Sequence, residues 1–186
     1  YFNVVPGLAG TYRIGKNQTY RTIGDATRAL YRFGVSAPVT FELVDKYYDE
    51  GTLDLTEKEI INIISEERTA ELYKAYQPAI DLRSRIVGVC DTLDDGTIRI
   101  NPITFKPSFE NSKKKSAVTI NLRSRAGIGI MIGACDTPSV KEAIVLEANY
   151  HQKRRWGSPD GHIHFDGGEQ KSLRFTLETG GSEFRA

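Results

Sequence analysis

The sequence has little of the features that assign a protein to a class at once. It holds two cysteines, Cys90 and Cys135, too few for a disulfide framework and without the CxxC spacing of a metal site. Two separate buried thiols are the simpler interpretation, and a single Cys90–Cys135 bridge is the alternative. No run of about 18 or more apolar residues is present, so we expect no membrane span.

An excess of charge of one sign is also missing, because 25 Lys and Arg residues stand against 24 Asp and Glu residues. A net charge of +1 creates no overall field that would attract nucleic acid or an anionic membrane, so neither is an expected partner. The basic run at Lys113–Lys115 is typical of a solvated loop. At 186 residues the chain is long enough to bury a core, and we expect one domain over residues 1–186, or a fragment of one.

An amphipathic helix is predicted near the N terminus, within about residues 20–34. Thr22 followed by Asp25 is close to a capping box, and Gly34 supplies a stop signal. Apolar residues recur at spacings of three and four, which places them on one stripe that must cover something apolar: Ala26, Ala29, Leu30 and Phe33.

Short strands dominate the rest of the chain. The stretch "PVTFELV" alternates, with Val39, Phe41 and Leu43 on one face. After Ile86, β-branched runs are separated by Gly, Asp, Pro and Ser clusters, which predicts a sandwich, a barrel or a β-solenoid. The echo between "VGVCDT" and "IGACDT" favours the solenoid.

Residues of about 56–95 interrupt this pattern. Thr56 with Glu59 forms a full capping box, and Leu72, Ala75 and Tyr76 have helical spacing before Pro78. We expect a partly helical insertion here, although "IINII" is equally compatible with a buried strand.

The opening "GTYRIG…YRTIGDATRALYRFGVSAPVTFELVDKYYDE" resembles the N-terminal coils of right-handed parallel β-helix domains of the pectin-lyase-like type, which occur in large bacterial secreted and cell-surface proteins. The stretches "NPITFKP" and "HIHFDGGEQKSLRF" resemble later coils. The resemblance implies an all-β fold: a right-handed parallel β-helix, or solenoid, with an N-terminal capping helix at about 20–34 and an insertion at about 56–95. It also implies an extracellular or cell-surface location.

Members of that family continue for many more coils, whereas this chain ends at Ala186 without a visible C-terminal cap. A solenoid needs a cap at each end. We therefore expect a fragment, or a module whose C-terminal end is covered by another protein chain or a missing downstream domain, with the contact after Phe175.

Two histidines, His162 and His164, are the candidate metal ligands, with Asp166 two residues further on. Alternate residues of a strand share a face, and two imidazoles with a carboxylate can bind zinc or copper. If "HIHFDGG" is a strand, however, Ile163 and Phe165 face the core and the histidines face water. We therefore expect no metal and no cofactor.

Polysaccharide lyases and hydrolases of the resembling fold use carboxylates, and the sequence offers five candidates in two clusters: Asp91, Asp94, Asp95, Asp160 and Asp166. Asp near Gly is the ordinary composition of turns, because the side chain bonds the local backbone. We assign no catalytic residue. The candidate ligand-binding surface mixes aromatic and basic side chains that can stack on glycans or hold anions: Tyr150, Lys153, Arg154, Arg155 and Trp156.

These observations favour a non-catalytic extracellular module that acts as a surface scaffold, an adhesin or an assembly subunit. The reason is that no acid, base and nucleophile converge in the sequence. The alternative is a carbohydrate-active enzyme of the lyase or hydrolase kind, or a glycan-binding domain.

Overall fold

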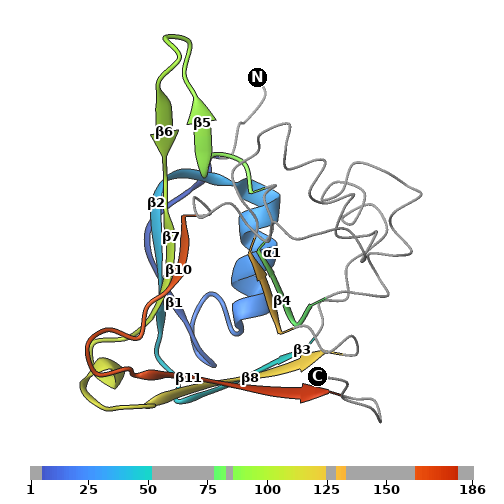
Figure 1. The fold of residues 1–186 in the computed structure, drawn as a ribbon, viewed down its shortest axis with the longest axis vertical. Helices are drawn as coiled ribbons and strands as arrows, with labels where there is room; N and C mark the ends of the chain where they lie inside the picture. Colours follow the sequence, from blue (N-terminus) through green and yellow to red (C-terminus); the bar gives the residue numbers. More distant parts are fainter. Residues whose placement is uncertain (1–5, 52–77, 83–85, 125–128, 133–161, 180–186) are drawn as a thin grey trace, which may run out of the picture.

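The structure is a computed structural model that describes residues 6–51, 78–82, 86–124, 129–132 and 162–179. In these residues, three parallel sheets face a shared core, and Figure 1 shows them on three sides of helix α1 (Ile23–Phe33). Sheet A has the order β1 (Leu8–Ile14), β2 (Val35–Leu43), β7 (Ile103–Pro107) and β10 (Ile163–Phe165). Sheet B has the order β3 (Tyr47–Gly51), β8 (Val118–Ser124) and β11 (Leu173–Thr179). Sheet C pairs β4 (Ile80–Leu82) with β9 (Ile130–Ile132).

Sheet A is organised by phenylalanines at one register position. Phe41 lies opposite Phe105, and Phe105 lies opposite Phe165. Each pair of rings stacks with a centroid distance of 4.9 Å, a geometry that adds to the burial of apolar surface. Val39, Phe41 and Leu43 are all buried, so the predicted strand and its inward face are confirmed.

Helix α1 has the predicted boundaries and cap. The Thr22 hydroxyl accepts a hydrogen bond from the backbone N–H of Asp25, and the Asp25 carboxylate accepts one from Thr22 N–H, which completes the capping box. Ala26, Ala29 and Leu30 are buried as expected. Phe33, the last helical residue, is exposed instead, with the Arg32 guanidinium 5.2 Å above its ring, because the covered stripe ends one turn earlier. In the described part of the chain, no helix has the length and apolarity that crossing a membrane requires.

A buried carboxylate fixes α1 to sheet B. The two oxygens of Glu50, on β3, accept hydrogen bonds from the backbone N–H groups of Ile23 and Gly24 at 2.7 and 2.9 Å. These N–H groups belong to the first helical turn and have no partner within the helix. Burial, which outweighs the two hydrogen bonds, raises the pKa of Glu50 above its ordinary value. Helix α1 also contacts β1 and β4, so it packs against the first strand of each parallel sheet.

The corner between sheets A and B is fixed by Tyr48. Its hydroxyl donates to the carbonyl of Ile14 at 2.6 Å and accepts from the N–H of Asp45 at 2.9 Å. Burial raises the pKa of Tyr48 to about 12, so the phenol keeps its donor proton over the physiological range.

One segment expected to form stacked strands is a hairpin. Strand β5 (Cys90–Thr92) pairs antiparallel with β6 (Ile98–Ile100), and both form sheet D. The turn is closed by a bond from the N–H of Leu93 to the carbonyl of Thr97, and Gly96 adopts a φ of +80°. The Asp-Asp-Gly turn therefore folds this segment back on itself. In Figure 1 the hairpin projects away from the three parallel sheets.

The predicted fold class is wrong. The described residues form small separate sheets and one core helix, a mixture of α and β, and among them no sheet closes or runs on as a solenoid. The local reason is the turn at residues 93–97, which makes an antiparallel pair where a rung was expected. The helix predicted within 56–77, the second half of the Cys-Asp-Thr echo and Cys135 lie outside the described residues.

Gly88 lies where sheet A meets the start of the hairpin segment, and a side chain there is expected to destabilise the fold. Its φ is +88°, and a Cβ would lie 1.9 Å from the carbonyl oxygen of Val35. Gly96 has a similar φ of +80° but open space around it. Alanine at Gly96 therefore causes backbone strain alone, whereas alanine at Gly88 causes strain and a clash. Gly88→Ala should lower the free energy of unfolding by about 3 kcal/mol or more, and Gly96→Ala by about 1 kcal/mol, in urea denaturation. Equal losses would contradict the contact with Val35.

The raised pKa of Glu50 gives a pH-dependence with a defined sign. Between the ordinary carboxyl pKa and the raised folded pKa, the folded state holds a proton that the unfolded state has lost. The contribution of this group to the free energy of unfolding therefore falls as pH rises through that window. Glu50→Gln should abolish this decrease, measured by urea denaturation at a series of pH values from the ordinary carboxyl pKa of about 4 upward. Glu178→Gln, at an exposed position on β11, controls for the change in net charge. Parallel curves of unfolding free energy against pH for wild type and Glu50→Gln would contradict the assignment.

Candidate interaction site

The predicted aromatic and basic surface lies outside the described residues: Tyr150, Lys153, Arg154, Arg155 and Trp156. Asp160 lies outside them too. Glycan binding at these residues therefore stays a prediction.

The histidines do not form a shared metal-binding face in the described structure. His162 precedes β10 and has a φ of +49°, so it does not continue the alternation of the strand. His164 is exposed on β10 opposite Thr104, while Ile163 is buried and Phe165 packs against the core, as expected for this strand. Within the described ranges, no group of three His, Cys, Asp or Glu side chains is placed to hold a metal ion.

Two of the candidate carboxylates hold turns. Asp95 accepts hydrogen bonds from the N–H and the hydroxyl of Thr97 at 2.9 and 2.6 Å, and these bonds lower the pKa of Asp95. Asp166 accepts one from the N–H of Gly168 at 2.7 Å. Both side chains therefore bond their local backbone, as their position next to glycine predicts. Asp94 is exposed in the same turn as Asp95.

The feature that stands out is the end of the molecule opposite α1, where β10 and β11 are the last described strands of sheets A and B. We call β10 and β11 together the open end. Phe175 and Leu177 on β11 are each 42% exposed, whereas their partners on β8, Ile120 and Leu122, are 0% and 5% exposed. The difference arises because a strand lies on both sides of β8 but on one described side of β11.

The stacked phenylalanines end at the same place. Phe165 is half-buried, stacks on Phe105 on one side, and meets the ring of Phe175 edge-to-face at 5.6 Å. The last rings of sheets A and B therefore make one continuous apolar surface at the open end. Large apolar side chains grouped in this way mark interaction sites more often than single exposed ones do.

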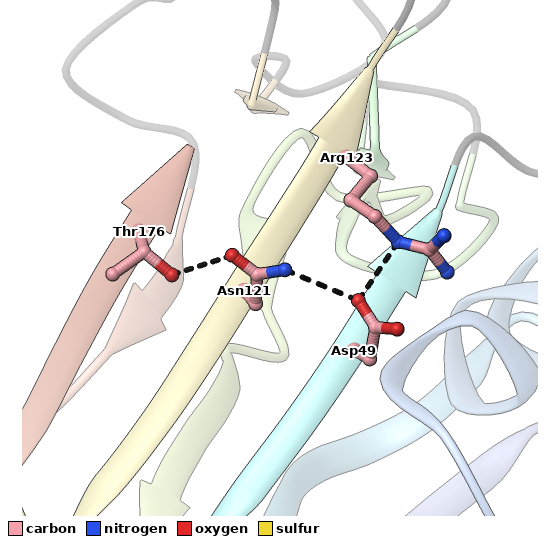
Figure 2. Close-up of polar contacts among 4 residues, drawn as sticks. All are labelled: Asp49, Asn121, Arg123 and Thr176. Atoms are coloured by element: carbon pink, nitrogen blue, oxygen red, sulfur yellow. Dashed lines mark hydrogen bonds and ion pairs between the residues drawn. The ribbon is translucent and has the colours of Figure 1, made fainter. Parts of the chain in front are cut away.

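A row of polar side chains crosses the outer face of sheet B and ends at the open end (Figure 2). Asp49, Asn121 and Thr176 lie at one register position on β3, β8 and β11. The Asn121 amide nitrogen donates to Asp49 Oδ1 at 3.2 Å, and the Thr176 hydroxyl donates to Asn121 Oδ1 at 2.6 Å. Arg123 Nε donates to the same oxygen of Asp49 at 2.8 Å. Asn121, only 3% exposed, makes both of its bonds inside this row.

Comparison of the chain with protein-family models, with curated proteins and with solved structures gave no match. The resemblance to pectin-lyase-like domains therefore has no support from these comparisons.

The polar row is expected to be sensitive to the charge at Asn121. Asn121→Asp replaces the donor to Asp49 by a second carboxylate, which should lower the free energy of unfolding by about 2 kcal/mol at neutral pH. The loss should shrink as the pH falls toward 4, because one of the two carboxylates then takes up a proton. Adding Asp49→Asn to the same chain restores one donor and should recover most of the loss. Urea denaturation measures all three proteins; a loss independent of pH and of Asp49→Asn would contradict the hydrogen-bonded row.

Proposed function

We propose that this chain is a non-catalytic binding module that holds another protein chain at the open end. Three observations support the proposal, and the one that carries it is the exposure of Phe175 and Leu177 at positions that are buried on the neighbouring strand. The outer edges of β10 and β11 pair with no described strand, which leaves N–H and C=O groups for an added strand. The opposite end of the core is covered by α1.

The occupant that fits best is a strand of a different protein, added parallel to β11. Every pairing in sheets A, B and C is parallel, so the open end presents parallel geometry. Two copies of this chain joined by a twofold axis would instead bring β11 antiparallel to itself. A head-to-tail pair would need the opposite end, where α1 lies. Among the roles expected from the sequence, these points favour assembly subunit or scaffold; the extracellular location stays a prediction.

A capped peptide with the sequence of β8, VTINLRS, provides the first test, because β8 is the strand that β11 already pairs with. Titrated into the isotope-labelled full chain, it should shift backbone amide signals within residues 162–179. Phe175→Ser should weaken binding about tenfold, because the apolar contact is lost. Phe109→Ser removes a phenylalanine that is 71% exposed elsewhere and should leave binding unchanged.

The absence of any amide shift at a peptide concentration of about 1 mM would overturn the proposal, as would shifts outside the open end or equal effects of the two substitutions. Sedimentation of the chain alone tests the other occupant. A monomer is expected. A dimer that Phe175→Ser dissociates would assign the open end to a second copy and would also overturn the proposed partner.

A further inference from the structure

The polar row on sheet B has a fixed direction of hydrogen bonding. An ionised carboxylate has no proton to donate, so Asp49 accepts from both Arg123 and Asn121. The amide nitrogen of Asn121 must therefore face Asp49, and its carbonyl oxygen faces Thr176. A carbonyl oxygen accepts only, so the hydroxyl proton of Thr176 is committed to Asn121. The direction set at β3 is carried across the sheet to its edge.

The consequence lies at the open end. With its proton committed, the Thr176 oxygen offers only lone pairs to whatever lies beyond β11, and no described residue donates to it. Figure 2 shows Thr176 as the last member of the row. A neighbour at this register position satisfies Thr176 only if it carries a donor, whereas a carboxylate there would place acceptor against acceptor.

We infer that Thr176 selects the partner strand through the side chain that lies opposite it. This inference rests on the proposed binding of a strand at the open end, and it specifies which side chains that strand carries. The partner segment is extended and parallel to β11, with three consecutive positions: apolar, hydrogen-bond donor, apolar. The apolar residues cover Phe175 and Leu177, as Ile120 and Leu122 do on the other side of β11. The residue between them carries an amide, a hydroxyl or a basic group, and Asp and Glu are excluded.

Two peptides that differ at one residue test whether Thr176 selects its partner strand. The first is capped VTINLRS, whose asparagine falls opposite Thr176 when the peptide adds in the register that β8 has with β11. The second carries aspartate in place of that asparagine. We expect the asparagine peptide to bind the full chain at least about tenfold more tightly, measured by the same amide shifts at neutral pH. Lowering the pH toward 4 should narrow the difference, because a protonated aspartate regains a donor.

Thr176→Val separates local selection from long-range charge repulsion. Valine keeps the β-branched shape but has no acceptor, so the preference for asparagine should fall to about threefold or less. Whatever preference remains reports the net effect of the charges on this face, where Asp49 and Glu178 oppose Arg123 and Arg174. The melting temperature of Thr176→Val controls for loss of fold. The matched variant is Thr119→Val, on β8 and on the same outer face of sheet B.

Failure of the proposed strand binding and failure of the proposed selection by Thr176 give different results. If neither peptide binds, the proposed function fails and the inference falls with it. If both peptides bind equally well to the wild-type chain, the open end is a strand-binding site but Thr176 does not select, and the inference is overturned. If the preference survives in Thr176→Val undiminished, the selection comes from net charge, which overturns it as well.

Discussion

The parallel register of sheet A is the constraint from which the other contacts of the core follow. Phe105 stacks on Phe41 at one side and on Phe165 at the other, so β7 is held in register from both sides. A slip by one residue would bring Thr104 and Lys106 into the core in place of Ile103 and Phe105. The register passes to sheet B through the corners, where the side-chain amide of Asn111, between β7 and β8, donates to the carbonyls of Leu43 and Val44 at the end of β2. The polar row on sheet B exists because this alignment is kept.

The two ends of the core differ in how their backbone N–H groups and apolar side chains are covered. At the α1 end, the first helical N–H groups bond Glu50, and buried Leu30 and Ala26 lie against the core. This end is therefore satisfied by residues of the chain itself. At the other end, rings and strand edges continue to the surface with no described cover. A buried N–H or an exposed aromatic surface is costly only where nothing compensates it, which is the physical reason for proposing association at the open end.

Features of this fold that depend on residues close together in the sequence could be predicted from it, whereas features that depend on distant residues could not. The capping box of Thr22 and Asp25 and the inward face of β2 depend on neighbours within a few residues, and both are confirmed. The predicted fold class is wrong at a local signal too, because the Asp-Asp-Gly turn is a hairpin signal and forms an antiparallel pair, whereas a solenoid stacks its strands in parallel. The polar row was missed for a different reason. Asp49 and Asn121 are 72 positions apart, and only the register of sheet B brings them together.

In the proposed complex, selectivity at the open end comes from polar residues such as Thr176 rather than from apolar ones. An open strand edge pairs with almost any extended backbone, and apolar surface attracts apolar surface without regard to its source. Both contribute affinity but discriminate poorly. A hydrogen bond contributes little net energy when formed and costs more when its partner is mismatched and buried, so it discriminates mainly by penalty. Thr176, flanked by Phe175 and Leu177, is placed where such a mismatch would be shielded from water once a strand has bound. In the proposed complex, the direction imposed by Asp49 on β3 and Arg123 on β8 then determines which side chains escape that penalty.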